Sequence, residues 1–187
     1  MRLPRIKVPG HAAAYHVVTR ANGRQFKLGP ELKQYFIDLL RKLKGLYYIE
    51  YAAFTVLDNH YHLIARMSDP KDIRHEEAIK RWNTYHAGTI YCKNAAEEKH
   101  RTQVVEELTD ISSFMKRLNY HVSVRHNQIA ETEGTIWEQR FRSSIVERGY
   151  ALVHCAAYIE LNAFRASLVR KPEEYAFGQG RIVTVPK

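Results

Sequence analysis

Two histidines separated by one residue, in the stretch Asn59-His60-Tyr61-His62, could hold a metal ion. On a β-strand alternate side chains share a face, so His60 and His62 would project to the same side, about 6.5–7 Å apart along the chain. Two imidazoles at that spacing can bind one divalent cation. The chain has 10 histidines, so the same spacing also fits a chance pair on a half-exposed sheet face.

Basic residues interleaved with aromatic ones form a second pattern, in segments 20–26 and 137–142. Arginine can bind phosphates and aromatic rings can stack on unpaired bases, so the pattern is typical of a surface for single-stranded nucleic acid. Trp137 and Phe141 fit equally well as core residues beside solvated arginines. The candidate DNA-binding residues are Arg20, Arg24, Trp137, Arg140 and Arg142.

Tyr120 lies in the centre of a long predicted helix and is the candidate nucleophile. A tyrosine hydroxyl can attack a phosphodiester and form a covalent phosphotyrosine when a metal ion polarises the phosphate. Most tyrosines, however, are packing residues with a solvated hydroxyl, and the chain has 12 of them. No P-loop, dinucleotide-binding glycine motif or HExxH motif occurs, which argues against nucleotide-binding and zinc-protease functions.

The composition predicts one globular domain, residues 1–187, with a polyanionic partner. Apolar residues make up 45% and charged residues 26% of the chain, and the net charge is +9. A basic excess of this size favours nucleic acid as the partner, although it also occurs in basic proteins without one. The cysteines, Cys92 and Cys155, lack the spacing of a disulfide scaffold or a four-cysteine zinc site. No apolar run approaches membrane-spanning length, so we expect no membrane partner and a cytoplasmic location.

The apolar periodicity predicts the elements that must position these residues. The order is strand, helix, strand, strand, helix, strand, helix, which is the ferredoxin-like split βαβ plan of an α+β protein. We therefore expect an antiparallel sheet with helices on one face. The polar segment 68–106 is predicted to be an insertion with local helix, and Gly45 is predicted to end the first helix. The predicted strands cover 14–20, 48–57, 60–67 and 142–147.

Four blocks of the sequence, in order, resemble the REP-associated tyrosine transposases and related HUH single-tyrosine transposases of insertion sequences. Together they extend over roughly residues 3–170. The blocks are Tyr15-His16-Val17 with Arg20-Ala21-Asn22-Gly23-Arg24, Asn59-His60-Tyr61-His62-Leu63, Gly134-Thr135-Ile136-Trp137-Glu138-Gln139-Arg140-Phe141-Arg142-Ser143, and Tyr158-Ile159-Glu160-Leu161-Asn162-Ala163-Phe164-Arg165-Ala166.

The resemblance implies a ferredoxin-like protein that cleaves and rejoins single-stranded or hairpin DNA through a 5′-phosphotyrosine. It implies that His60 and His62 bind Mg²⁺ or Mn²⁺, with Asn127 on the long helix as the candidate third ligand. It leaves both a monomer and a homodimer open.

One departure from the family pattern affects the nucleophile. Met115, Leu118 and Asn127 match the family's helix, but its tyrosine position falls on Val122. Tyr120 lies two residues earlier, a rotation of about 200°, so we expect Val122 to be buried and Tyr120 to point away from it. Two alternatives therefore stay open: a non-catalytic DNA- or RNA-binding module that has lost its nucleophile, and a metal-dependent nuclease that uses an activated water.

Overall fold

The computed structural model describes residues 8, 10–86 and 98–180. Cys92 and residues 87–97 of the predicted insertion lie outside them. The strands are β1 (Ala13–Arg20), β2 (Ile49–Val56), β3 (His60–Met67), β4 (Arg142–Val146) and β5 (Gly178–Gly180). The α-helices are α1 (Pro30–Leu46), α2 (His75–Tyr85), α3 (Glu98–Leu108), α4 (Ile111–Ala130), α5 (Tyr150–Glu160) and α6 (Asn162–Arg165).

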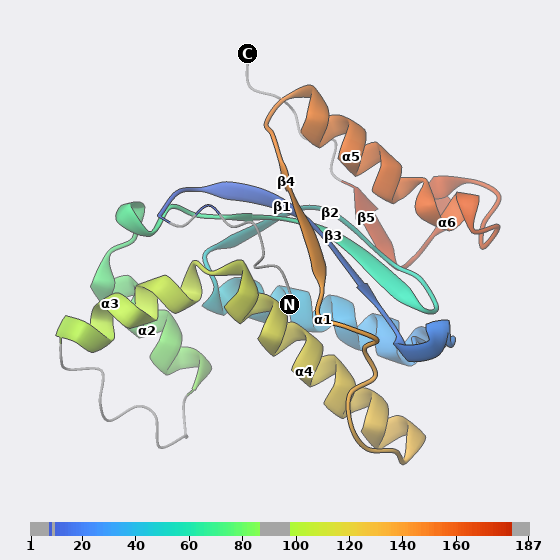
Figure 1. Cartoon of the computed structure of the whole chain (residues 1–187), viewed down its shortest axis with the longest axis horizontal. Helices are drawn as coiled ribbons and strands as arrows, with labels where there is room; N and C mark the ends of the chain where they lie inside the picture. The colour runs from blue at the N-terminus through green and yellow to red at the C-terminus, as the bar shows by residue number, and fades with distance from the viewer. Residues whose placement is uncertain (1–7, 9, 87–97, 181–187) are drawn as a thin grey trace, which may run out of the picture.

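The strands form one five-stranded sheet in the order β4-β1-β3-β2-β5, and every neighbouring pair is antiparallel (Figure 1). Strands β1 to β4 together with α1 and α4 make the split βαβ unit. The predicted α+β ferredoxin-like fold is therefore confirmed. The short strand β5 adds to the edge at β2 and follows the last element of the predicted order.

One face of the sheet carries the main core, and we call it the helical face because α1 and α4 pack against it (Figure 1). Alternate residues of β3 supply its apolar side chains: Tyr61, Leu63 and Ala65 are fully buried there. Asp110 caps the N-terminus of α4, since its side chain accepts a hydrogen bond from the Ser113 amide at 3.1 Å. The first helix runs past Gly45 to Leu46, so the prediction that Gly45 ends it was wrong by one residue.

The opposite face, which we call the histidine face, carries α5. Ala156 and Ile159 of this helix pack against Ala53 and Ile64 of the sheet. Figure 1 shows α5 on the side of the sheet away from α1 and α4. The expectation of helices on one face thus holds for α1 and α4 but not for α5. The helix follows β4 and lies outside the βαβ crossovers, so the handedness rule for those crossovers does not decide its side.

The described part of segment 68–106 includes α2 and most of α3, which pack onto the main core. Ala78 of α2 and Val105 of α3 are buried with the residues of the helical face. Arg117 of α4 helps to hold α3, because it donates hydrogen bonds to the Tyr47 hydroxyl at 3.0 Å and to Glu107 at 3.3 Å. Across 8, 10–86 and 98–180, no helix combines the length and apolar character that a bilayer span requires.

Candidate active site

The two histidines of the HxH motif lie side by side on the histidine face. They alternate with Tyr61 along β3, so they point away from the helical face. Their ring centroids are 5.2 Å apart. His62 is only 6% exposed, while His60 is half-buried at the start of the strand. Strand alternation therefore brings the pair together as the sequence predicted.

Asn59 orients the His60 ring. Its amide nitrogen donates to the Arg24 carbonyl at 3.1 Å, which turns the amide oxygen toward His60. That oxygen lies 2.6 Å from His60 Nδ1 and can only accept, so His60 carries its proton on Nδ1. The lone pair of the neutral ring is then on Nε2, which is the form that can bind a metal ion.

A third histidine, His16 of β1, belongs to the same cluster. Its Nε2 lies 2.9 Å from His62 Nδ1, at hydrogen-bonding distance. The two rings meet edge to edge in nearly parallel planes, with centroids 5.2 Å apart and an interplanar angle of 18°. His16 was not predicted as a site residue, because 46 residues separate it from His62 and only the β1–β3 pairing joins them.

The histidine cluster is electrically neutral near pH 7. Burial lowers the pKa of His62 to about 3, helped by the nearby His60, His16 and Arg20. Burial also lowers the pKa of His60 and of His16. Neutral imidazoles keep a lone pair, so the cluster fits a divalent cation. Among the residues that the structure describes, no three His, Cys, Asp or Glu side chains form a complete metal site.

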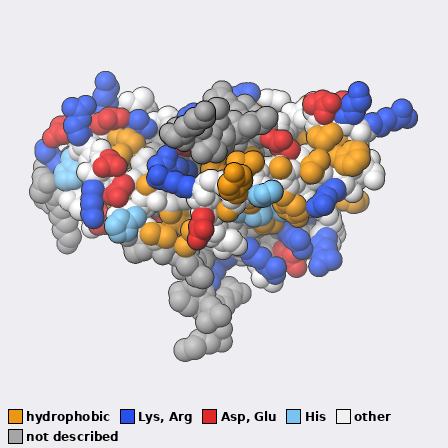
Figure 2. Space-filling view, turned by 90° about the horizontal axis from the view of Figure 1, so that it is seen from above, with side chains coloured by type: hydrophobic (Ala, Val, Ile, Leu, Met, Phe, Trp, Pro, Cys, Tyr) orange, Lys and Arg blue, Asp and Glu red, His pale blue; other side chains and the backbone are white. Residues whose placement is uncertain are grey.

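Tyr158 of α5 lies against this cluster. Its ring centroid is 5.9 Å from that of His62 and 6.5 Å from that of His16, and both contacts are edge-on. The side chain is 42% exposed, so it is open to a substrate. Arg165 lies over its ring, 5.6 Å from the centroid. Figure 2, seen from the side of α5, shows histidine side chains between hydrophobic and basic ones on this face.

Tyr120, the predicted nucleophile, is not brought to the histidines. It lies on α4, which covers the helical face, and it is 64% exposed on the outer side of that helix. Val122 is fully buried in the core, as the helix periodicity predicted. The sheet itself separates Tyr120 from His60 and His62. The prediction that Tyr120 reaches these histidines was therefore wrong, because Tyr120 lies on the opposite side of the sheet. Moving the helix by one or two residues along its axis would leave Tyr120 on that side.

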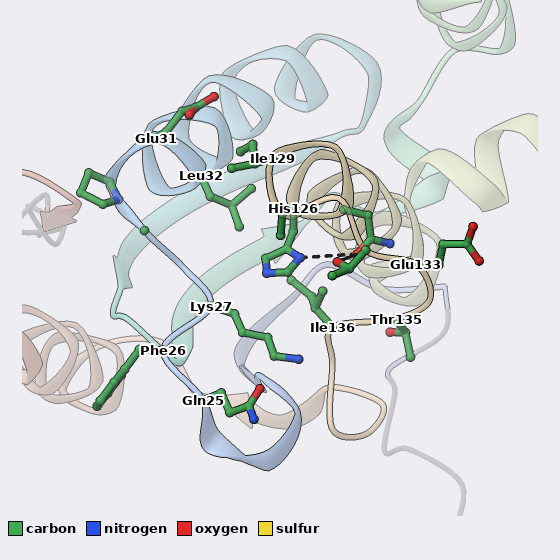
Figure 3. A pocket seen from close by; sticks show the side chains of 15 residues that line it. Gln25, Phe26, Lys27, Glu31, Leu32, His126, Ile129, Glu133, Thr135 and Ile136 are labelled. Carbon is green, nitrogen blue, oxygen red and sulfur yellow. Dashed lines mark hydrogen bonds between the residues drawn. The ribbon is translucent and has the colours of Figure 1, made fainter.

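Asn127, the predicted third metal ligand, also lies apart from the pair. Its amide donates to the Gly134 carbonyl at 2.8 Å and accepts from the Thr132 hydroxyl at 3.1 Å, which closes the loop after α4. It lines a groove between the end of α4 and the segment before α1 (Figure 3). The prediction that Asn127 joins the histidines was wrong, because α4 packs on the helical face.

Trp137 is a core residue and not a stacking platform. It is 7% exposed, and its ring packs edge-on against Tyr61 at 5.6 Å. Its indole nitrogen donates to the Asn119 carbonyl at 3.0 Å. Of the two interpretations that the sequence left open for Trp137, the structure selects the core residue, so its predicted contact with a base was wrong.

The arginines divide into two groups. Arg20 pairs with His60 across the β1–β3 ladder, and Arg142 pairs with Val18, the neighbour of His62. Directly paired residues share a face, so both arginines flank the histidines. Arg24 lies in the short 3₁₀ helix after β1, and Arg140 precedes β4; both are exposed. Of the four arginines, Arg20 and Arg142 are therefore the better placed to contact a DNA strand that lies on the histidine face.

Three residues in or beside the histidine cluster were not predicted as site residues: His16, Asn59 and Tyr158. Each lies in one of the sequence blocks that carry the family resemblance. For Tyr158 the missing signal was the side of the sheet on which its helix packs.

Comparison with known proteins supports the fold. No protein-family model and no curated protein matches the chain. Among solved structures, it is similar to a REP-associated tyrosine transposase bound to a REP hairpin, with a TM-score of 0.53 and 16% identity over 95% of this chain and 81% of that one. A candidate transposase from Deinococcus radiodurans aligns with a TM-score of 0.41 and 16% identity over 90% of this chain and 92% of that one. At these identities the likeness to the first structure establishes a transposase-like fold.

Proposed function

We propose that the chain cleaves and rejoins single-stranded or hairpin DNA, with Tyr158 as the nucleophile and His60 and His62 as ligands of Mg²⁺ or Mn²⁺. The observation that carries the proposal is the position of Tyr158, half-exposed at 5.9 Å from the His62 ring on the histidine face. Perturbed histidines beside an accessible nucleophile in one surface cluster are a common mark of an active site.

The histidines fit a divalent cation that is shared with a substrate. Two neutral imidazoles suit Mn²⁺ well, and Mg²⁺ accepts them when oxygen atoms complete its shell. Phosphate oxygens and water would supply those remaining positions. A bound cation would polarise the scissile phosphate and neutralise the charge that develops on it.

The tyrosine step balances without a further reactant. The Tyr158 hydroxyl oxygen attacks phosphorus, the new O–P bond forms as the P–O3′ bond breaks, and the phenolic proton leaves to solvent while the 3′ oxygen gains one. The product is a 5′-phosphotyrosine and a free 3′ hydroxyl. Attack of a 3′ hydroxyl on that phosphotyrosine reverses the bond changes and rejoins DNA.

Positive charge around the cluster supports DNA as the substrate. Arg20 and Arg142 flank the histidines on the sheet, Arg165 lies over Tyr158, and the chain carries a net charge of +9. The transposase of similar fold is bound to a REP hairpin, which makes a DNA hairpin the first substrate to test.

The decisive experiment looks for a covalent protein–DNA adduct on a denaturing gel. The protein is incubated with Mn²⁺ and a pool of hairpins with randomised single-stranded flanks. The hairpins are labelled at the 3′ end, because the segment held by a 5′-phosphotyrosine keeps that end. The wild type should form the adduct and Tyr158→Phe should lose it completely. Tyr120→Phe is the matched control and should form as much adduct as the wild type.

Other outcomes would select the other functions. Cleavage without an adduct, unaffected by Tyr158→Phe, would indicate a nuclease that uses water. Binding with neither cleavage nor adduct would indicate the non-catalytic module. An adduct that survives in Tyr158→Phe and disappears in Tyr120→Phe would show that the assignment from the histidine face is wrong.

A further inference from the structure

We infer that His16 is a positioning residue that sets the tautomer of His62 and so prepares His62 to bind the cation. The inference rests on the proposed metal site at His60 and His62 and adds a residue outside the HxH motif. Its basis is the 2.9 Å contact between His16 Nε2 and His62 Nδ1.

The two rings share one hydrogen bond, and its direction determines the chemistry of His62. A neutral imidazole has one N–H and one lone pair, so one of the facing nitrogens donates and the other accepts. If His62 Nδ1 donates, its lone pair is on Nε2 and faces away from His16. If His16 donates, His62 has its proton on Nε2 and loses that nitrogen as a ligand.

The surroundings restrict His62 to this one contact at Nδ1. The ring is 6% exposed, which leaves little water to compete for Nδ1. The nearly parallel ring planes, at an interplanar angle of 18°, and the pairing of β1 with β3 hold the two nitrogens toward each other. His62 binds a cation through Nε2 only when His16 accepts, so His16 does for His62 what the Asn59 amide oxygen does for His60.

Hydrogen-bond acceptors behind histidine ligands commonly have this role. They fix the ring orientation and the tautomer, and their removal typically weakens metal binding by about 10–100-fold. The acceptor is usually a carbonyl or carboxylate, whereas here an imidazole takes its place.

The test uses three variants of the full chain. His16→Leu removes the acceptor with similar side-chain volume, His16→Gln restores an acceptor through its amide oxygen, and His154→Leu removes an exposed histidine of α5 as the matched control. The first measurement is the ¹⁵N NMR pattern of the His62 ring in metal-free protein, which reports the tautomer directly. The second is Mn²⁺ affinity by calorimetry.

We expect the Nδ1–H tautomer of His62 in the wild type, in His16→Gln and in His154→Leu. In His16→Leu we expect a shift toward the Nε2–H form and Mn²⁺ affinity about 10–100-fold weaker. His16→Gln should recover most of that loss, which a purely structural role would not explain. Because the tautomer is also measured in the wild type, the inference stays testable even if His16→Leu fails to fold.

Two results separate failure of this inference from failure of the proposed function. An Nε2–H tautomer of His62 in the wild type, or unchanged Mn²⁺ affinity in folded His16→Leu, overturns the role of His16 and leaves the metal site standing. A wild type that binds no Mn²⁺ removes the metal site, and the role of His16 falls with it.

Discussion

The two faces of the sheet are built from the same strands but differ in what they do. In β3 the residues Tyr61, Leu63 and Ala65 point into the helical face and are fully buried. Their neighbours His60 and His62 point to the histidine face, where α5 covers part of the surface and leaves Tyr158 accessible. Strand parity therefore decides where chemistry occurs: a nucleophile for these histidines must come from an element on their own side of the sheet.

The largest expected effect concerns Trp137, which belongs to the helical face although it lies in a basic segment. We expect Trp137→Ala to lower the free energy of unfolding by about 3–5 kcal/mol, because it leaves a cavity beside Tyr61 and removes the indole hydrogen bond. Urea denaturation measures the change, with Arg140→Ala as an exposed control from the same segment. A stable Trp137→Ala protein with weakened DNA binding would return Trp137 to the binding surface.

The substitution Val122→Tyr tests whether a tyrosine on α4, within the core of the helical face, can reach the histidines. It restores a tyrosine at the position that the family pattern indicates, but Val122 is fully buried beneath the sheet. We expect a loss of about 1–3 kcal/mol in stability from overpacking. No adduct should form through the new side chain. The double variant Val122→Tyr with Tyr158→Phe measures this on the denaturing gel, and any adduct there would show that α4 can reach the histidines.

Much of the fold could be predicted from the sequence, because its signals are local. The strands predicted over 60–67 and 142–147 and the burial of Val122 in the long helix depend on periodicity within a few residues. The strand β5 and the side chosen by α5 depend on contacts between distant segments, which such patterns do not encode.

The site was predictable in part. The histidine pair follows from the two-residue period of a strand, and the same period could have excluded Tyr120. Tyr61 and Leu63 had to face the helices that cross over the sheet, so His60 and His62 had to face away from them. The hydrogen bond from His16 could not be predicted, because it depends on the register between β1 and β3. The role of Trp137 could not be predicted either, because a tryptophan can serve either in a core or on a surface that stacks on bases.

The neutral histidines predict a dependence of stability on pH. The unfolded chain takes a proton on His62 below about pH 6.5, whereas the folded protein resists until about pH 3. The stabilisation is therefore complete above pH 6.5 and is lost as the pH falls toward 3. By linkage, protonation of His62 alone in the unfolded chain lowers the free energy of unfolding by up to about 2 kcal/mol between pH 7 and pH 5. His60 and His16 act in the same direction.

Urea denaturation at the two pH values checks this prediction. His62→Gln removes the titrating group, so its loss of stability between pH 7 and pH 5 should be smaller than that of the wild type. His154→Leu, which changes an exposed histidine outside the cluster, should keep the wild-type difference. Equal losses in His62→Gln and the wild type would show that burial does not hold His62 neutral.

The smallest expected effect distinguishes the two faces as DNA surfaces. Arg142 flanks the histidine face, whereas Arg41 of α1 is exposed at 71% and pairs with Asp38 at 2.7 Å, on the other side of the sheet. Either change to alanine lowers the net charge of +9 by one, so a general electrostatic attraction would respond equally to both. A phosphate contact at Arg142 instead releases a counterion, and its loss reduces the dependence of log affinity on log salt by about 0.7 for a single strand.

Fluorescence anisotropy with a single-stranded oligonucleotide over a salt series should therefore show a shallower slope for Arg142→Ala and the wild-type slope for Arg41→Ala. Identical slopes for the two variants would mean that the DNA is not held on the histidine face.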